Sequence, residues 1–220
     1  MFRKLAVAAV ALAAGVVPAG AQTGIAHASS PAVLGGGSGI VIGNQGVCTL
    51  TTIGHDAAGR LVGLTAGHCS QAGTSVVAEA NRDAGVVGTF AYTNAHMDYA
   101  VIEFDPDSVI PVNRVGNTTI TELGGPAQFP DIACKQGYTT GQTCGLAYGD
   151  VFQSNNWAWT QICVLPGDSG GPIMVGTTLV GMVNGYLYVP CLGPQLGGNM
   201  AAIIDDIDTR GGVGAGYDPI

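Results

Sequence analysis

Positive charge is scarce in this chain. Its 220 residues include 7 Lys and Arg against 15 Asp and Glu, which gives a formal net charge of −8 at pH 7. Proteins that bind nucleic acid use a basic surface to hold the phosphate backbone, and this composition does not supply one. We therefore expect no nucleic-acid partner. The acidic balance favours solubility outside the cell and says nothing specific about a substrate.

Long apolar runs are also missing, with one short exception near the N-terminus. Residues 5–17 are apolar, follow Arg3 and Lys4, and lead to an Ala-x-Ala pattern at residues 19–21. This arrangement is typical of a secretory signal peptide, whereas a membrane anchor needs ~18 or more apolar residues. We predict a signal peptide over residues 1–21, with residues 26–28 as a second candidate cleavage site. The mature chain should be exported and have no membrane span.

None of the six cysteines forms a C-x-x-C pair, which argues against metal or redox chemistry. In an exported chain, six cysteines predict three disulfides. The sequence alone allows 15 connectivities for them. We expect no metal and no cofactor.

Helical periodicity is rare. Short apolar runs separated by Gly, Asn, Asp and Pro predict an all-β sandwich or barrel. The expected strands cover residues 39–42, 61–64, 75–78, 86–90, 99–104, 151–153, 157–160, 172–175 and 178–183. One short C-terminal helix is expected over residues 199–208, with Asn199 as its N-cap. Residues 211–216 are glycine-rich and predict a frayed tail.

Residues 167–172 (GDSGGP) place a serine between glycines, directly after an aspartate. Acyl transfer needs an exposed nucleophile on a tight turn, together with backbone N–H groups aimed at the developing oxyanion. Glycines allow such a turn and the close approach of a substrate carbonyl. The alternative is an ordinary surface turn, because 36 of the 220 residues are glycine.

Two further segments favour a catalytic role for Ser169 over an ordinary surface turn. His68 lies in residues 65–69 (TAGHC) after an apolar run, and an imidazole can exchange protons with a serine near neutral pH. Asp98 precedes the apolar residues 99–104 and could hold the His68 ring in one tautomer. The chain order His68, Asp98, Ser169 is that of the chymotrypsin-type triad and differs from the subtilisin and α/β-hydrolase orders.

With a third segment, residues 134–145 (CKQGYTTGQTCG), the chain resembles the chymotrypsin-fold serine proteases, and among them the bacterial streptogrisin and α-lytic branch. The resemblance covers about residues 33–210. It implies two antiparallel Greek-key β-barrels and hydrolysis of peptide bonds through an acyl-enzyme intermediate. It also implies the disulfides Cys48–Cys69, Cys134–Cys144 and Cys163–Cys191.

We place the boundary between the two barrels near residues 114–117. The first barrel then covers residues 33–116 and the second covers residues 117–210. Residues 22–32 are expected to be a short mobile segment and residues 211–220 a Gly-rich tail. The active cleft should lie between the halves, and we expect a monomer.

The candidate roles follow the resemblance. Ser169 is the nucleophile, His68 the general acid and base, and Asp98 the group that orients the imidazole. The backbone N–H groups of Gly167 and Ser169 should form the oxyanion hole, where one donor typically contributes about 10²–10³ in turnover.

Asp168 lies beside this turn and needs a positive partner if it is buried. The resembled branch supplies a basic residue directly after the first loop cysteine, which here is Lys135. The alternative partner is a new α-amino group at Val33.

Specificity is expected from residues 163–166 and 183–186, which carry no charge. The candidate substrate-binding residues are Val164, Asn184, Gly185 and Tyr186, and they predict a preference for small or medium apolar side chains. If Tyr186 turns outward, the pocket is deep instead. Asn184 also replaces the serine common in the resembled branch, so hydrogen bonding behind Asp98 should differ.

The sequence therefore predicts a secreted serine endopeptidase that acts on peptide or protein substrates. The alternative is a catalytically silent, protease-like binding protein, because a fold can be retained after its activity is lost. An esterase that uses the same nucleophile is a third possibility.

Overall fold

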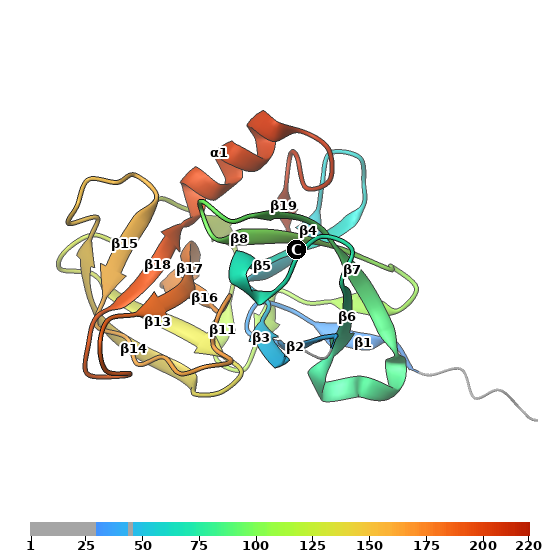
Figure 1. Cartoon of the computed structure of the whole chain (residues 1–220), viewed down its shortest axis with the longest axis horizontal. Helices are drawn as coiled ribbons and strands as arrows, with labels where there is room; N and C mark the ends of the chain where they lie inside the picture. The colour runs from blue at the N-terminus through green and yellow to red at the C-terminus, as the bar shows by residue number, and fades with distance from the viewer. Residues whose placement is uncertain (1–29, 44–45) are drawn as a thin grey trace, which may run out of the picture.

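The computed structural model describes residues 30–43 and 46–220, which form two curved β-sheets side by side with one helix across the top (Figure 1). The all-β class and the short C-terminal helix are confirmed. The predicted signal peptide, residues 1–21, lies outside the described residues, as does most of the segment predicted to be mobile. Ala32, the last residue of the segment predicted to be mobile, is buried and opens strand β1 (Ala32–Leu34).

The first sheet is built from the N-terminal half and the last residues of the chain. Its strands pair in the order β19-β4-β5-β8-β7-β6-β2-β3. Their bounds are β2 (Gly39–Ile42), β3 (Gly46–Thr49), β4 (Thr52–His55), β5 (Leu61–Ala66), β6 (Ser75–Ala78), β7 (Val86–Asn94), β8 (Tyr99–Phe104) and β19 (Asp218–Pro219). The sheet curves, but among the described strands no pairing joins β3 to β19, so it does not close. It encloses a large apolar core that includes Leu64, Phe90 and Ile102.

The second sheet closes into a six-stranded barrel, because β17 pairs with both β16 and β18. Its strands are β13 (Ile132–Gly137), β14 (Gly141–Gly149), β15 (Trp157–Thr160), β16 (Pro172–Val175), β17 (Thr178–Tyr186) and β18 (Gln195–Asn199). The short β12 (Glu122–Leu123) adds to β17 in parallel. This barrel has a small core of mostly Ala, Val and Ile.

Short elements connect and flank the two sheets. Strand β9 (Val109–Pro111) pairs in parallel with β1, and β10 (Arg114–Val115) forms a hairpin with β11 (Thr118–Thr119). Two 3₁₀ turns, η1 (Gly67–Cys69) and η2 (Glu79–Ala84), follow β5 and β6. The β10–β11 hairpin occupies the place predicted for the boundary between halves.

Helix α1 (Met200–Arg210) begins where the sequence predicts it. The Asn199 side chain accepts a hydrogen bond from the Ala201 N–H at 3.1 Å, which caps the first turn. Met200, Ile203 and Ile207 are buried at helical spacing and join the first core. No helix in the described ranges has the length and apolar character needed to cross a membrane.

The structure corrects two sequence-based predictions. Residues 151–153, predicted to be a strand, form a turn. Asp150 accepts hydrogen bonds from Ser154 Oγ and the Asn155 N–H, and these bonds reverse the direction of the chain. The predicted frayed tail is packed instead. Its Gly214 N–H donates to buried Asp56 at 3.0 Å, and buried Tyr217 bonds Thr52 at 2.8 Å.

Candidate active site

His68 is held at the end of a fully buried strand. Strand β5 is buried at each of its positions, and η1 turns the chain immediately after it. The disulfide Cys48–Cys69 joins η1 to β3 on the far side of His68. The backbone of His68 is therefore anchored from both sides, while its imidazole reaches solvent.

Asp98 lies in the turn before β8 with a φ of 51°. Aspartate is one of the few residues that accept this left-handed conformation. The Gly67 N–H donates to the Asp98 carbonyl at 2.9 Å, and the His68 N–H donates to Asp98 Oδ1 at 2.6 Å. These bonds tie the turn that carries the carboxylate directly to the turn that carries the imidazole.

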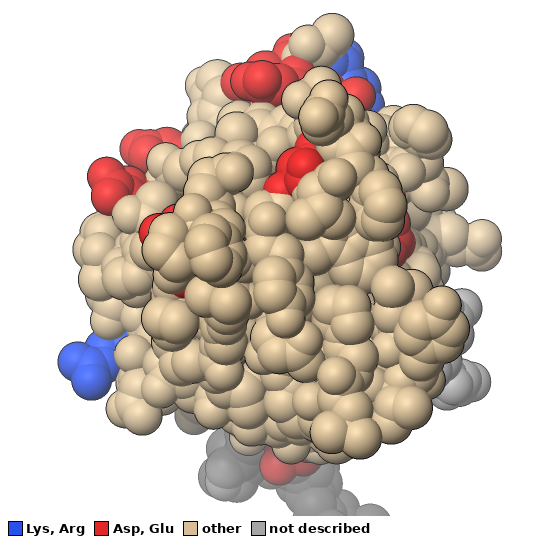
Figure 2. All heavy atoms as spheres, turned by 90° about the vertical axis from the view of Figure 1, so that its left-hand side faces the viewer, with Lys and Arg blue, Asp and Glu red and all other residues tan. Residues whose placement is uncertain are grey.

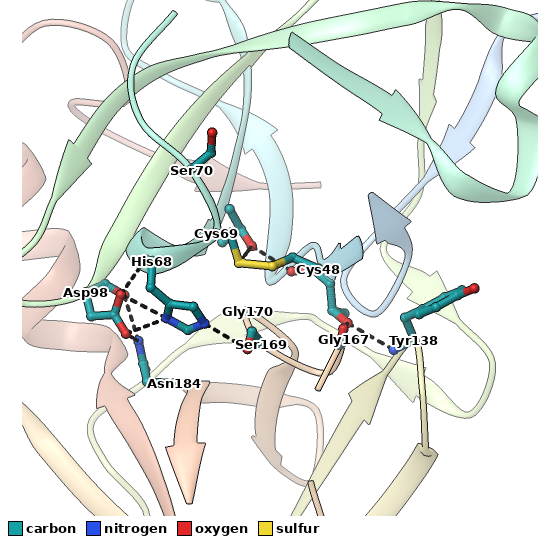
Figure 3. Close-up of a disulfide and its surroundings, with 12 residues drawn as sticks. Cys48, His68, Cys69, Ser70, Asp98, Tyr138, Gly167, Ser169, Gly170 and Asn184 are labelled. Carbon is teal, nitrogen blue, oxygen red and sulfur yellow. Dashed lines mark hydrogen bonds and ion pairs between the residues drawn. A yellow bond between two sulfur atoms is a disulfide. The ribbon is translucent and has the colours of Figure 1, made fainter. Parts of the chain in front are cut away.

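The three predicted catalytic side chains form a continuous hydrogen-bonded chain (Figure 3). His68 Nδ1 lies 2.8 Å from Asp98 Oδ2, and His68 Nε2 lies 2.9 Å from Ser169 Oγ. The hydrogen bond to Asp98 raises the pKa of His68. Burial acts to raise the pKa of Asp98, but the bonds from His68 and Asn184 outweigh it and leave the pKa below its usual value.

Asn184 makes three hydrogen bonds behind the carboxylate. Its Nδ2 donates to Asp98 Oδ2 at 2.9 Å and to the Asp98 carbonyl at 2.7 Å, and its Oδ1 accepts from the Gly198 N–H at 2.8 Å. The side chain was predicted among the substrate-binding residues, but it faces Asp98 (Figure 3). A serine hydroxyl has one donor hydrogen, whereas the Asn184 amide has two. Asn184 can therefore bond the carboxylate and the backbone carbonyl of Asp98 at the same time.

The turn that carries Ser169 is fixed by the first sheet. The Thr49 N–H donates to the Ser169 carbonyl at 2.8 Å, and Thr49 Oγ1 donates to the Gly167 carbonyl at 2.8 Å. Gly170 has a φ of 84°, and a Cβ there would lie 2.3 Å from the Thr49 carbonyl. Glycine is therefore required for this close contact between the halves.

The backbone donors predicted for an oxyanion hole belong to Gly167 and Ser169. Among the described residues, neither N–H group donates a hydrogen bond. Thr139 Oγ1 donates to the Pro166 carbonyl at 2.7 Å, which fixes the plane of the peptide that carries the Gly167 N–H. Two fixed donors without partners, next to Ser169, meet the requirement for stabilising an oxyanion.

Asp168 is buried and surrounded by donors. Its carboxylate accepts from the N–H groups of Thr139, Thr140 and Leu165 at 2.9–3.0 Å and from Thr140 Oγ1 at 2.7 Å. Lys135 Nζ lies 3.6 Å from Asp168 Oδ2 and donates to Thr140 Oγ1. The predicted partners are thus brought together, with the Thr140 hydroxyl as a bridge that the sequence analysis missed.

The other predicted partner of Asp168 is placed elsewhere. Val33 lies within β1, where it pairs with Ile110 of β9. Lys135 is completely buried, and burial lowers its pKa although the nearby Asp168 charge acts to raise it. Burying a carboxylate is costly unless a positive charge lies nearby, and Lys135 Nζ is the buried cation beside Asp168.

The predicted specificity residues lie on two neighbouring segments. Val164 is buried, and Tyr186 is 36% exposed at the end of β17. A Cβ on Gly185 would meet no atom within 4 Å, so its face is open. Gln195, the register partner of Tyr186, is buried and accepts a hydrogen bond from Thr160 Oγ1 at 2.6 Å. The sequence analysis missed Gln195 because nothing local marks it.

A cavity of about 290 Å³ opens beside His68 and Ser169, against the Cys48–Cys69 bridge and Pro166. The structure contains the disulfides Cys48–Cys69, Cys134–Cys144 and Cys163–Cys191, the same three pairs that the resemblance implies. The last two lie in the second half, where they brace the β13–β14 hairpin and the segment before the Ser169 turn.

Comparison with known proteins finds similarity to serine proteases, although no family model matches the chain. Streptogrisin-D from Streptomyces griseus is 29% identical over 133 residues, which is 56% of this chain and 34% of that protein. Serine protease 2 from Streptomyces fradiae is 27% identical over 69% of this chain and 94% of its own length.

Among solved structures, a Nocardiopsis protease superposes with a TM-score of 0.67 and 25% identity, over 80% of this chain and 96% of its own. The resemblance drawn from the sequence motifs is therefore confirmed, as is the two-part β architecture it implies.

Proposed function

We propose that this chain, a serine-type endopeptidase of the chymotrypsin fold, is secreted and cleaves polypeptides after small or medium apolar residues. The observation that supports catalysis most directly is the continuous path from Asp98 through His68 to Ser169 Oγ. General base catalysis needs its heavy atoms within about 2.6–3.2 Å of each other, and both contacts fall in that range.

The mechanism follows from these contacts. Ser169 Oγ attacks the scissile carbonyl carbon while its proton passes to His68 Nε2, and Asp98 stabilises the imidazolium that forms. The carbonyl electron pair moves to oxygen, which accepts hydrogen bonds from the Gly167 and Ser169 N–H groups. His68 then gives its proton to the leaving amine and the acyl-enzyme forms. Water repeats the sequence, so the product acid departs and Ser169 regains its proton.

The substrate preference rests on the two wall segments. Neither residues 163–166 nor residues 183–186 carry a charge, so nothing there would pair with a Lys or Arg side chain. Buried Gln195 and partly exposed Tyr186 are register partners across the β17–β18 ladder, and we expect them to limit the depth behind Gly185. A shallow, uncharged site favours side chains the size of Ala, Val or Thr.

Labelling with a fluorophosphonate tests the catalytic assignment. We expect the folded, mature protein to be captured covalently at Ser169, and the Ser169→Ala variant to remain unlabelled. Folded protein that resists labelling would point to a silent, protease-like binding protein. Ester and peptide substrates compared on the same preparation separate a peptidase from an esterase.

A peptide library tests the preference. We expect cleavage after Ala, Val or Thr to exceed cleavage after Phe by at least tenfold. Replacing Tyr186 by Gly should remove most of that difference by deepening the pocket. A profile that favours Arg would contradict the proposal.

The cellular location rests on the N-terminal pattern and on three disulfides, which form in oxidising compartments. N-terminal sequencing of protein from the culture medium should begin at Gln22. A start at Ser29 would indicate the second cleavage site instead. Intact protein retained in the cytoplasm would overturn the proposal.

A further inference from the structure

Helix α1 carries three aspartates, and one of them is drawn toward the protein. Asp205 and Asp208 are exposed, whereas Asp206 is partly buried. The helix crosses the top of the molecule (Figure 1), and in the side view of Figure 2 acidic side chains stand at that end. A carboxylate that is drawn inward needs hydrogen-bond donors to compensate for lost water, so the partners of Asp206 indicate what holds it there.

Two donors meet the same oxygen of Asp206. Tyr99 OH donates to Asp206 Oδ2 at 2.5 Å, and Asn94 Nδ2 donates to that oxygen at 2.9 Å. Tyr99 is completely buried, and burial together with the Asp206 carboxylate raises the pKa of its hydroxyl. The phenol therefore stays protonated and remains a donor. Hydrogen bonds to a charged acceptor are stronger than those between neutral groups, so Asp206 holds both side chains firmly.

The two donors stand at the two ends of the turn that carries Asp98. Asn94 ends β7 and Tyr99 opens β8, and these residues are register partners in the β7–β8 ladder. Asn94 Oδ1 also accepts from two backbone N–H groups inside the turn, at 3.0 and 3.1 Å. Asp206 is therefore joined to both ends of the turn and, through one amide, to its interior.

The direction of the Asp98 carboxylate depends on this turn. Asp98 has a φ of 51°, and a residue in the left-handed region keeps that conformation only where its surroundings hold it. His68 Nδ1 lies 3.1 and 2.8 Å from Asp98 Oδ1 and Oδ2. A rotation of the turn would move both oxygens away from the imidazole together.

The support that carries Asp206 is itself fixed. Ile207, the next residue of α1, is buried in the first core. Arg210 lies over the Tyr92 ring at 4.1 Å from its centroid, and that ring lies 6.0 Å from the ring of Tyr99. A side chain on a packed helix positions its partners more precisely than one on a loop does.

The start of the same helix reaches Asp98 by a second route. Asn199 caps α1, and the N–H of the preceding Gly198 donates to Asn184 Oδ1 at 2.8 Å. Asn184 Nδ2 donates to Asp98 Oδ2 at 2.9 Å. The start of the helix thus meets the carboxylate, while Asp206, further along it, meets the turn on which the carboxylate stands.

We propose that Asp206 is a positioning residue, which fixes the turn that aims Asp98 at His68. The proposal rests on the proposed peptidase function and adds to it a residue outside the triad. Among the described residues, Asp206 shares no hydrogen bond with any triad side chain, so its contribution passes through Asp98. Its removal should lower kcat and leave KM nearly unchanged.

Asp206→Ala tests this role in the mature protein, with rates expressed per active site counted by fluorophosphonate labelling. We expect kcat to fall about tenfold, with KM within about twofold of the wild type. The acidic limb of kcat/KM should move to lower pH, because a loosened Asp98 stabilises the imidazolium of His68 less and lowers its pKa. Asp206→Asn keeps an oxygen for both donors and should restore most of kcat.

Asp205→Ala is the matched control. It removes the same charge from an exposed neighbour on α1 that accepts no hydrogen bond among the described residues, so its kinetics should equal those of the wild type. Tyr99→Phe provides a second variant that keeps the buried ring and removes only the hydroxyl. It should shift the acidic limb in the same direction as Asp206→Ala, by a smaller amount.

The outcomes separate positioning from a purely structural role and from the function it rests on. Lower stability of Asp206→Ala and Tyr99→Phe with unchanged kcat per active site and an unchanged acidic limb would overturn the proposal. The proton resonance of His68 Nδ1–H, which its bond to Asp98 shifts downfield, should move upfield in Asp206→Ala and needs no substrate to be measured. That movement in a wild-type protein that neither cleaves peptides nor takes the label would overturn the peptidase and support the link from Asp206 to Asp98.

Discussion

The two halves of this molecule hold their proposed catalytic groups in different ways. The first half places His68 just after β5 and Asp98 just before β8, and both strands are packed into a large apolar core. The second half has a much smaller core of its own, made of Ala, Val and Ile residues, and contributes Met174, Leu179 and Met182 to the large core. Around that small core lie two of the three disulfides and the buried polar groups Lys135, Asp168 and Gln195.

The two halves therefore rely on different sources of rigidity, apolar packing in the first half and hydrogen bonds in the second. Apolar packing fixes a backbone without directional bonds, and it suits strands that run straight to a catalytic side chain. A turn with free N–H groups cannot be packed in that way, because the donors must remain available to substrate. Hydrogen bonds fix this turn instead, both those that Asp168 accepts within the second half and those that Thr49 donates from the first sheet. Removing one partner of such a bond leaves the other buried without a partner, which costs stability.

The largest effect should follow from breaking the buried pair of the second half. Lys135→Met leaves Asp168 buried without a cation, and we expect about 3–5 kcal/mol of lost stability. We also expect kcat/KM to fall at least a hundredfold, because the oxyanion turn loses its anchor. Urea unfolding and peptide hydrolysis measure the two losses.

Thr140→Val is the matched control for this prediction. It removes the bridging hydroxyl while it keeps the buried cation and carboxylate. Its losses should be clearly smaller than those of Lys135→Met. A Lys135→Met variant with normal activity would show that the turn is held by other contacts.

Truncating the two cores sharpens the comparison. Leu64→Ala in the first half should lower the free energy of unfolding by about 4–5 kcal/mol, the upper part of the usual range. Ile162→Ala in the second half should cost about 2–3 kcal/mol, because fewer apolar neighbours surround it. Thermal and chemical unfolding give both values. Equal losses would mean that the halves do not differ in their dependence on apolar packing.

Removing a disulfide from the second half should have a moderate effect. The double variant Cys163→Ser/Cys191→Ser is expected to lose about 2–4 kcal/mol of stability. The two tryptophans, Trp157 and Trp159, both lie in β15, so their fluorescence reports on this half. We expect the fluorescence transition to shift to lower urea concentration. An unchanged transition would assign the rigidity of this half to hydrogen bonds alone.

The smallest effect concerns the contact between Asn184 of the second half and Asp98 of the first half. The pKa of His68 is raised by its bond to Asp98, so activity should be lost as the pH falls through a value above the usual 6.5 or so. Asn184→Ala loosens Asp98, which should lower the His68 pKa and move this acidic limb to lower pH. It should also lower kcat/KM by about 5–50-fold through lost hydrogen bonds to a charged group.

Asn184→Ser retains one donor and should fall between the wild type and Asn184→Ala. A pH profile of kcat/KM for the three proteins measures the order. Three identical acidic limbs would show that Asn184 does not position the carboxylate.

The sequence predicted what depends on local chemistry. The triad order, the Asn199 cap and most strands of the first half follow from motifs and short-range patterns. The β13–β14 hairpin was read only as a disulfide loop, because its alternation is hidden by Gly, Gln and Thr. Thr140, Gln195 and the folded tail could not be predicted, since each acquires its role from partners far away in the chain.

The departures from expectation share a cause. Asp150 closes the turn at residues 151–153 through its own side chain, which outweighs the strand propensity of Val and Phe. The tail glycines adopt positive φ and allow the chain to reverse toward Asp56 and Thr52. In both places a side-chain hydrogen bond decides the path of the backbone.

The position of β19 has a consequence for how the protein folds during synthesis. Strand β19 pairs with β4, and Tyr217 fills part of the first core, so the earliest half to be synthesised lacks an edge strand until the latest residues arrive. The first half cannot complete its fold before residues 217–219 have been synthesised. A nascent chain still awaiting residues 217–219 would therefore lack the strand that covers β4, next to the strand that leads to His68.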